Sequence, residues 1–248
     1  MINSSQEKPS KPVFLNLQNI SKSFGAIEAL KGINMQLFAG EVVGLMGDNG
    51  AGKSTLIKIL SGNYPPTEGE MYLGGERRQF NKPVDARSNG IEVVYQDLAL
   101  CDHLTAAHNV FLGREKKKRL GPLKILDNGF MFSKAGEIFA MLKSETRPRD
   151  LVKQMSGGQR QAVAIARTQL SSPELVLMDE PTAAISVRQV SEVLGLIKRL
   201  QSQGVGVLLI SHRMPDIFTV CDRVVGYEEE RRLQISIYLK LLRTKLRD

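Results

Sequence analysis

Residues 47–54 read Gly47-Asp48-Asn49-Gly50-Ala51-Gly52-Lys53-Ser54, and this stretch decides the fold. The apolar run EVVGLM at 41–46 comes directly before it and predicts a short buried strand, while the periodic pattern of 53–60 predicts a helix. Three glycines allow the backbone between them to wrap around phosphate groups with its N–H groups pointing inward. The N-terminus of the following helix adds positive potential. The sequence therefore predicts a strand, a phosphate-binding loop and a helix in succession.

The spacing G-x-x-x-x-G-K-[ST] assigns roles to the last residues of this loop. Lys53 is expected to reach the β- and γ-phosphates of a nucleotide, and Ser54 to bind Mg²⁺. The alternative is a glycine-rich turn that carries Lys-Ser by chance. The predicted strand before it and helix after it disfavour that alternative.

A second motif, LVLMDE at 175–180, brings two adjacent carboxylates to the end of an apolar strand. Ligands of parallel sheets bind at the carboxyl ends of the strands. We expect Asp179 to hold Mg²⁺, through water, and Glu180 to polarise an attacking water. An isolated Asp-Glu pair would be read as a solvated strand end, but downstream of a phosphate loop the functional interpretation is favoured.

Predicted strands alternate with predicted helices along most of the chain. Such alternation indicates an α/β fold with a mostly parallel sheet and crossover helices. Between 96 and 154 the pattern is helical with loops, and it predicts a helical insert. Further strands are expected at 13–20, 90–95, 175–178 and 205–210, and a further helix at 187–203.

Composition excludes several classes of protein. The 248 residues are 42% hydrophobic and 24% charged, which is typical of a globular chain. No stretch approaches the ~20 apolar residues that span a bilayer. The polar start MINSSQEKPSKP lacks the apolar core of a signal peptide, so residues 1–12 are expected to be a disordered leader. We therefore expect a cytoplasmic chain that reaches a membrane only through a partner.

The formal net charge of +8 suggests nucleic acid, an anionic lipid surface or a merely basic protein. Its densest basic run contains no aromatic residue between the cations, so a nucleic-acid stacking surface is not indicated. A solvated loop is the favoured interpretation, and contact with lipid headgroups is the second. The run consists of Arg114, Lys116, Lys117, Lys118 and Arg119.

The stretch Ser156-Gly157-Gly158-Gln159-Arg160-Gln161 resembles the signature sequence of ABC ATPases. It lies shortly before the Asp-Glu strand, and a helical pattern follows it. Ser156 is a good helix N-cap, and two glycines permit close approach to a phosphate. A generic helix cap would explain Ser-Gly-Gly alone, but it would not explain why this stretch occurs together with the other motifs.

Other positions match the same family. Gln96, after the strand ending at Tyr95, resembles the glutamine that contacts Mg²⁺ and water. His212, after VLLIS, resembles the switch histidine that contacts the γ-phosphate, and Phe24 resembles the aromatic residue that stacks on adenine. For Phe24, an ordinary core phenylalanine remains an alternative.

The resemblance implies a P-loop NTPase (RecA-like) core with an N-terminal antiparallel β subdomain and an inserted α-helical subdomain. The ABC ATPase domain is expected over 13–225, with its core at 13–95 and 155–225, its helical subdomain at 96–154, and an atypical tail at 226–248. The resemblance also implies ATP and Mg²⁺ as cofactors. The expected nucleotide contacts are Phe24, Gly47, Asp48, Asn49, Gly50, Ala51, Gly52, Lys53, Ser54, Thr55, Ser156, Gly157, Gly158 and Gln159; the metal contacts are Ser54, Gln96 and Asp179, and the catalytic residues are Glu180, His212 and Gln96.

The family also implies a mode of action. A homodimer would enclose two ATP molecules, each between the phosphate loop of one subunit and the signature of the other. The helical subdomain would dock on a membrane permease, at the cytoplasmic face of the membrane. A soluble ABC ATPase acting on nucleic acid or ribosomes would need linker insertions or a second cassette, and neither is present. A catalytically dead regulatory module is disfavoured by Lys53, Asp179, Glu180 and His212.

Several stretches are similar to the ATPases of monosaccharide importers, and among them to the single-cassette members. This similarity implies uptake of a sugar delivered by a separate extracytoplasmic binding protein, with no role for nucleic acid. The stretches are YQDLAL at 95–100, NVFLGRE at 109–115, RQAVAIAR at 160–167 and EPTAA at 180–184.

Two departures from the family pattern stand out. The stretch Ala183-Ala184-Ile185-Ser186 lacks the aspartate that many ABC ATPases carry there. After residue 225 the family continues with a strand, a glycine-containing turn and another strand, whereas this chain reads GYEEERRLQISIYLKLLRTKLRD. One interpretation is a lineage-specific helix with Leu239, Leu241, Leu242 and Leu246 on an apolar stripe. The other is a frameshifted tail, which would leave a sheet edge exposed.

Overall fold

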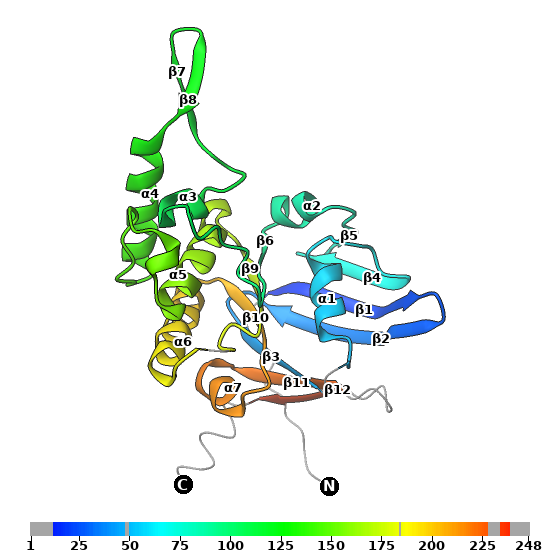
Figure 1. Ribbon diagram of the computed structural model, residues 1–248. Helices are drawn as coiled ribbons and strands as arrows, with labels where there is room; N and C mark the ends of the chain where they lie inside the picture. Colours follow the sequence, from blue (N-terminus) through cyan, green and yellow to red (C-terminus); the bar gives the residue numbers. More distant parts are fainter. Residues whose placement is uncertain (1–11, 48–49, 184, 228–233, 239–248) are drawn as a thin grey trace, which may run out of the picture.

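The computed structural model describes residues 12–47, 50–183, 185–227 and 234–238. The expected leader lies outside these ranges except for Pro12, whose carbonyl oxygen accepts a hydrogen bond from Ala39 N at 3.1 Å. Within the described part, the chain forms a six-stranded sheet, a four-stranded sheet and a two-stranded hairpin. Figure 1 shows the helices from α3 to α6 on one side of the six-stranded sheet and strands β1, β2 and β4 on the other. The α/β class expected from the alternating pattern is confirmed.

The six-stranded sheet has the order β12-β11-β3-β10-β9-β6. Its inner strands are short and rich in Val, Leu and Ile, as befits strands covered on both faces. All neighbours from β11 to β6 are parallel. The strands are β3 (Val42–Gly47), β6 (Ile91–Val94), β9 (Leu175–Asp179), β10 (Gly206–Ile210), β11 (Arg223–Tyr227) and β12 (Gln234–Tyr238).

The last strand corrects an expectation. The frameshift interpretation leaves the sheet edge beyond residue 225 exposed, but the backbone of β12 pairs antiparallel with β11, from Gln234 opposite Tyr227 to Tyr238 opposite Arg223. The expectation of an exposed edge is therefore wrong for β11, because residues 234–238 pair with it. The helix expected around Leu239–Leu246 lies outside the described residues.

The second sheet is antiparallel, with the order β2-β1-β4-β5. Its inner face, the helix α1 (Lys53–Leu60) and one face of the six-stranded sheet share an apolar core that contains Leu17, Leu56 and Leu177. The short helix α2 (Pro83–Ser88) adds Ala86 to it. This sheet is the N-terminal β unit that the resemblance implied. Its strands are β1 (Val13–Phe24), β2 (Ile27–Phe38), β4 (Glu68–Leu73) and β5 (Glu76–Arg78).

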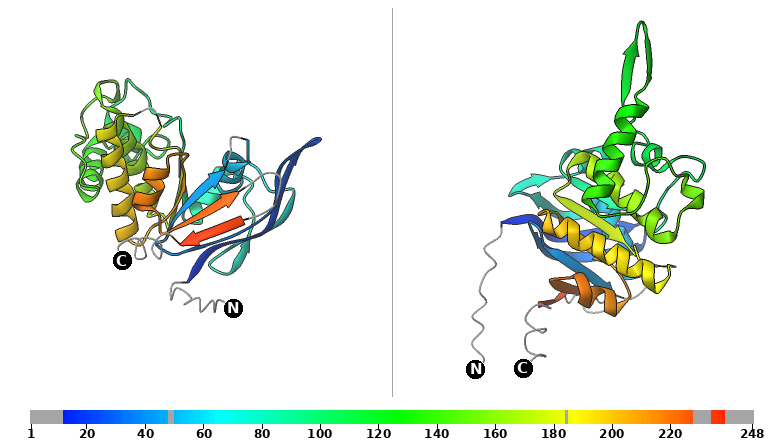
Figure 2. Two further views of the ribbon diagram at one scale, coloured as in Figure 1. Left: turned by 90° about the horizontal axis from the view of Figure 1, so that it is seen from below. Right: turned by 90° about the vertical axis from the view of Figure 1, so that its left-hand side faces the viewer.

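Helices cover the opposite face of the six-stranded sheet. Their core is continuous from Phe111 and Phe139, in the helical segment, to Val207 in the sheet. Figure 2 shows these helices grouped on one side of the six-stranded sheet and the antiparallel sheet on the other. The helices are α3 (Ala106–Val110), α4 (Asn128–Met141), α5 (Gly157–Thr168), α6 (Val187–Ser202) and α7 (Met214–Val220), with 3-10 turns at Val152–Gln154 and Gln169–Ser171.

The segment from 96 to 154 is not helical throughout. Where a solvated loop was expected around 114–119, the chain forms the hairpin of β7 (Lys117–Leu120) and β8 (Leu123–Leu126). The hairpin projects from the helical side of the molecule just before α4 (Figure 1). Of the helices that the structure describes, none combines the length and the apolar character that crossing a membrane requires.

Candidate functional site

The phosphate loop joins β3 to α1, and glycine geometry shapes it. Gly50 and Gly52 have φ angles of +93° and +82°, which residues with a side chain rarely adopt. A Cβ atom at Gly52 would also clash with the carbonyl oxygen of Ala29 on β2. The loop therefore closes against the antiparallel sheet only because position 52 lacks a side chain. Asp48 and Asn49, two of the expected nucleotide contacts, lie outside the described residues.

One pocket of about 270 Å³ collects most of the expected phosphate and metal residues. It lies where α1 begins and where β9 and β10 end, at the carboxyl edge of the parallel sheet. Lys53, which follows the loop, reaches back across it: its Nζ donates a hydrogen bond to the Gly47 carbonyl oxygen at 2.6 Å. The pocket is lined by Ala29, Gly50, Gly52, Lys53, Ser54, Thr55, Gln96, Asp179, Glu180 and Ile210.

Ser54 and Asp179 meet although 125 residues separate them. Ser54 Oγ donates to Asp179 Oδ2 at 3.2 Å. Burial raises the pKa of the Asp179 carboxyl above its ordinary value, and the Ser54 hydroxyl opposes that rise. A hydroxyl and a carboxylate are the oxygen ligands that Mg²⁺ prefers. This donor set fits a magnesium ion beside bound phosphates.

Glu180 sits immediately after β9 in a backbone conformation that is unusual for a glutamate, with φ of +49°. Two backbone hydrogen bonds hold it there: Glu180 N donates to Ile210 O at 3.0 Å, and Ala183 N donates to Glu180 O at 3.1 Å. Non-glycine residues in this region tend to be found at functional sites, where surrounding structure over-determines them. This backbone conformation directs the Glu180 carboxylate toward His212.

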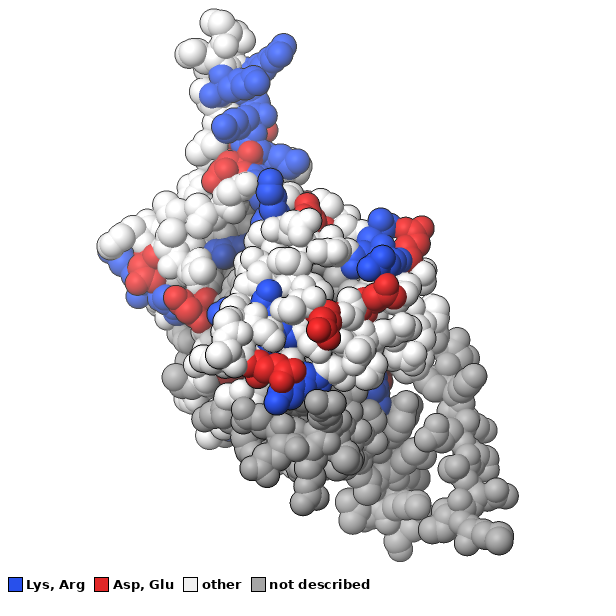
Figure 3. All heavy atoms as spheres, turned by 90° about the vertical axis from the view of Figure 1, so that its right-hand side faces the viewer, with Lys and Arg blue, Asp and Glu red and all other residues white. Residues whose placement is uncertain are grey.

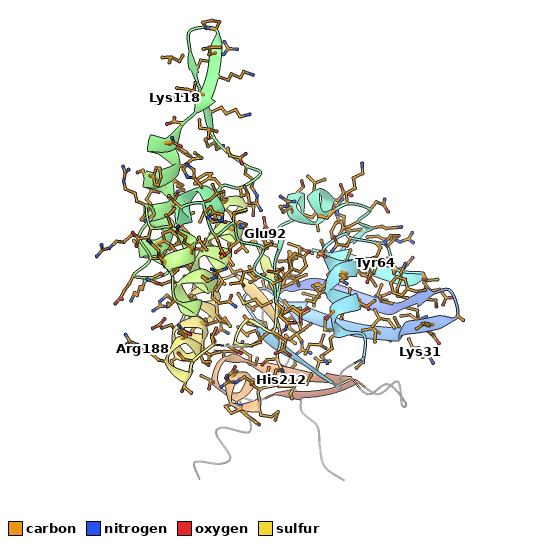
Figure 4. The ribbon with its side chains drawn as sticks, viewed as in Figure 1. Lys31, Tyr64, Glu92, Lys118, Arg188 and His212 are labelled. Atoms are coloured by element: carbon orange, nitrogen blue, oxygen red, sulfur yellow. The ribbon has the colours of Figure 1, made fainter. Side chains whose placement is uncertain are left out.

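His212 contacts the Glu180 side chain through two atoms. Its backbone N–H donates to Oε1 at 3.1 Å, and its ring Nδ1 lies 2.9 Å from Oε2. The Glu180 side chain is 14% exposed and that of His212 is 69% exposed. The histidine, labelled in Figure 4, thus lies on the solvent side of the glutamate, where it is free to reach a ligand.

An aromatic neighbour, Tyr64, connects Phe24 to the residues at the start of α1. Its half-exposed ring packs edge-on against Tyr64 with 5.3 Å between ring centroids, and Lys22 Nζ lies 5.1–5.3 Å from both rings. The Tyr64 hydroxyl is hydrogen-bonded to Thr55, at the start of α1. Tyr64, also labelled in Figure 4, was missed by sequence reasoning. Its sole sequence signal is an aromatic residue a few positions after the helix.

The signature residues begin α5. Ser156 Oγ accepts from Gln159 N at 3.3 Å, and Gln159 Oε1 accepts from Ser156 N at 2.9 Å, which is a reciprocal capping box. Gly157 and Gly158 pack closely on the chain at and before α6: added Cβ atoms would lie 2.8 Å from Ile185 Cγ2 and 2.5 Å from Glu192 Oε2. Packing therefore favours glycine at 157, against the branched Ile185 side chain, whereas at 158 the flexible Glu192 carboxylate could move away.

The structure does not place the signature beside the phosphate loop. Ser156, Gly158 and Gln159 line a different groove, of about 450 Å³, together with residues of α6 such as Gln189 and Glu192. None of its lining residues belongs to the phosphate pocket. The two groups of expected nucleotide-binding residues therefore lie on separate surfaces of the chain, and each is called a half-site below.

A glycine-rich loop between a central parallel strand and a helix, facing a strand that ends in Asp-Glu, defines a P-loop nucleotide-binding protein. A family model described as "ABC transporter" matches residues 30–183. The chain belongs to the ABC transporter family, and it is an ATP-binding and ATP-hydrolysing cassette of that family.

Curated relatives are similar over most of the chain. The xylose/arabinose import ATP-binding protein XylG of Sulfolobus acidocaldarius is 44% identical over 85% of this chain and 82% of its own length. The fructose import ATP-binding protein FrcA of Rhizobium meliloti is 42% identical over 88% of this chain and 86% of its own. The ribose import ATP-binding protein RbsA of Geobacillus kaustophilus is 40% identical over 85% of this chain, which spans 42% of that relative.

Solved structures agree with the fold. A crystal structure of the ADP conformation of MJ1267, an ATP-binding cassette of an ABC transporter, covers 95% of both chains with a TM-score of 0.79 at 24% identity. The dimeric post-hydrolysis structure of the cassette MJ0796, bound to ADP and Pi, covers 91% of this chain and 98% of its own with a TM-score of 0.72 at 29% identity. Cassettes of this family therefore form dimers.

Proposed function

We propose that this cassette powers uptake of a monosaccharide through a separate membrane permease, as a homodimer at the cytoplasmic face of the membrane. Support for the sugar comes from relatives named for import of xylose/arabinose, fructose and ribose at 40–44% identity. An extracytoplasmic binding protein would deliver the sugar. The alternative is an ABC ATPase that acts in a process other than transport.

In the proposed mechanism, the loop N–H groups and Lys53 hold the phosphates of ATP, and the α1 N-terminus adds positive potential. Ser54 and Asp179 would hold Mg²⁺, with Gln96 at the same pocket, and the ion would neutralise charge on the phosphates. Glu180 accepts a hydrogen bond from the attacking water and orients it. His212 contacts the γ-phosphate. Phe24 stacks on adenine beside Tyr64. The chemistry is positioning and charge stabilisation of the transferred phosphoryl group.

The observation that carries the dimer proposal is the separation of the two half-sites. Ser156, Gly158 and Gln159 line a groove that shares no residue with the pocket of Lys53 and Glu180. A second copy, turned by a two-fold axis, supplies its signature to the first copy's phosphate loop and receives the same in return. ATP then joins the subunits, and hydrolysis separates them.

A third groove suits the permease. It has a volume of about 260 Å³ and lies between β6, the chain beyond Tyr95, and α5, next to Gln96. A part-buried ion pair lies in its wall: Arg114 Nη2 is 3.0 Å from Glu92 Oε1, which also accepts a hydrogen bond from Ser171 Oγ. Figure 4 labels Glu92 at the junction of the helical segment and the strands. A permease helix seated there would transmit its movement to Gln96 in the ATP pocket.

Purification of the chain from membranes in mild detergent tests this function. The expected result is co-purification of an integral membrane permease, and ATP hydrolysis by the reconstituted complex that rises when a sugar-loaded binding protein is added. Recovery of ribosomes or nucleic acid in place of a membrane protein would contradict the proposal and favour the non-transport alternative.

A further inference from the structure

The β7–β8 hairpin has a different chemistry on each of its two faces. Directly paired residues of an antiparallel hairpin share a face. One face carries Lys117 opposite Leu126 and Arg119 opposite Lys124. The other carries Lys118 opposite Ile125, and Leu120 opposite Leu123. The first face is therefore mostly cationic, and the second is mostly apolar.

Nothing within the described residues covers either face. Every residue of both strands is exposed, and the side chains of Leu120 and Leu123 near the tip are 63% and 64% exposed. In Figure 3 the hairpin is the projection at the top, with blue basic side chains along one side and uncharged atoms along the other. A two-stranded hairpin alone is marginally stable in water, so a surface that covers one of its faces would stabilise it.

The charge near the hairpin is strongly one-sided. Its strands and the residue before them contribute Lys116, Lys117, Lys118, Arg119 and Lys124, and no acidic residue lies between positions 116 and 126. The acidic groups that flank it stand at the base. They are Glu115 and Asp127, of which Asp127 Oδ1 lies 3.8 Å from Lys118 Nζ.

We propose that this hairpin binds an anionic lipid surface directly. Its cationic face attracts negatively charged headgroups, and Leu120, Leu123 and Ile125 enter the boundary between headgroups and acyl chains. The combination of an exposed apolar face with a basic one is the pattern of an interfacial membrane element, here built on a hairpin instead of a helix.

Electrostatics favours lipid over a permease loop as the occupant. Cytoplasmic loops of membrane proteins carry an excess of Lys and Arg, which would repel Lys117, Arg119 and Lys124. The cytoplasmic leaflet carries negative surface potential and attracts the same residues. Contact with lipid goes beyond the proposed function, in which the cassette reaches the membrane through the permease alone.

Vesicle flotation of the full chain, without ATP or permease, tests the proposal. The chain should float with vesicles of phosphatidylglycerol and phosphatidylcholine but not with phosphatidylcholine alone, and 0.5 M salt should weaken binding because it screens surface charge. Replacing Lys117, Arg119 and Lys124 together by Gln should weaken binding on the order of 100-fold. Leu120→Ser with Leu123→Ser should weaken it also, by a factor that changes little with salt, because this substitution removes apolar and not electrostatic attraction.

The matched control removes the same charge elsewhere. Replacing Lys31, Arg77 and Arg78 by Gln takes three exposed cations from the antiparallel sheet, and it should leave vesicle binding unchanged. Hydrolysis in vesicle-free solution should be the same in all variants, which shows that each is folded. Equal binding to neutral vesicles, or equal loss in the hairpin and control variants, would overturn the proposal. So would a hairpin variant that keeps lipid binding but no longer co-purifies with the permease.

Discussion

Glu180 combines an unusual backbone conformation with a proposed catalytic role. Its positive φ, held by hydrogen bonds to Ile210 and Ala183, sets the direction of its carboxylate, and His212 contacts both carboxylate oxygens. Asp179, one residue earlier, points to Ser54 instead. Two neighbouring carboxylates thus face two different partners, which suits the proposed division of roles, Asp179 for the metal and Glu180 for the water.

Glu180→Gln is expected to lower the rate of ATP hydrolysis by about 10²- to 10⁴-fold, because a neutral amide polarises the attacking water far less than a carboxylate does. The affinity for ATP should persist, since Lys53 and the loop are unchanged. Phosphate release and nucleotide binding measure the two effects. Glu174→Gln, at the other end of β9, is the control with a near-normal rate, and a similarly normal rate in Glu180→Gln would remove Glu180 from its role.

At the residue scale, sequence spacing predicted which residues would lie together, while their chemical roles stay predictions. The G-x-x-x-x-G-K-S spacing and the apolar strand before Asp179 placed Lys53, Ser54 and Asp179 in one pocket, as the structure finds. Tyr64 could not be found in this way. Its contacts with Phe24 and Thr55 bring together the end of β1, the chain after α1 and the start of α1, which no local pattern reports.

At the scale of elements, two capped helices, α5 and α6, form the signature groove. Ser156 caps α5 and Ser186 caps α6, each with a glutamine three residues later that completes a capping box. Gly157 and Gly158 let the two helix starts approach closely. This places the signature residues on an exposed rim, where a second subunit can reach them.

Ser156→Arg is expected to leave ATP binding to the single chain intact and to block ATP-dependent dimers, because the larger side chain occupies the rim that faces the partner's γ-phosphate. Equilibrium nucleotide binding and light scattering measure the two properties. Asp127→Arg removes the N-cap of α4 at a similar cost of ~1 kcal/mol, away from the groove, and should still dimerise. Dimers of normal affinity in Ser156→Arg would refute the role of the signature.

Gly195 lies inside α6, where no turn requires a glycine. An added Cβ would lie 3.3 Å from the flexible guanidinium of Arg199. Gly195→Ala should therefore raise the free energy of unfolding by about 1 kcal/mol and Tm by about 2–4 °C. Gly44→Ala is the opposing control, because its Cβ would lie 2.9 Å from Ile217 Cδ1 in the core, and it should lower Tm. A lower Tm for Gly195→Ala would show that α6 needs glycine there.

Elements with strong periodicity were predictable, and those stabilised by pairing were not. The helix at 53–60 coincides with α1, and the helix at 187–203 ends one residue beyond α6. The hairpin β7–β8 was missed because its exposed basic strands carry no buried face. Strand β12 was missed because it lies in the atypical sequence after residue 225, and its pairing with β11 does not show in that sequence.

At the scale of the whole molecule, the six-stranded sheet separates two functional surfaces. The phosphate loop and α1 lie on the side of the antiparallel sheet, and the signature groove lies on the side of α5 and α6 (Figure 2). The helical segment also carries the hairpin and a wall of the proposed permease groove. This layout suits the proposed dimer, in which each ATP site is completed by a second copy, and it puts the proposed lipid-binding hairpin and the wall of the proposed permease groove on the helical side.

The mass of the Glu180→Gln chain in solution tests this account most directly, since slow hydrolysis keeps ATP at the interface. Light scattering should give one chain of 27.5 kDa without nucleotide and twice that mass with ATP and Mg²⁺. The double variant Glu180→Gln/Ser156→Arg should keep the mass of one chain even with ATP and Mg²⁺. A single-chain mass at ATP concentrations that saturate the nucleotide site would contradict the account, because the phosphate loop would then complete its site without a second signature.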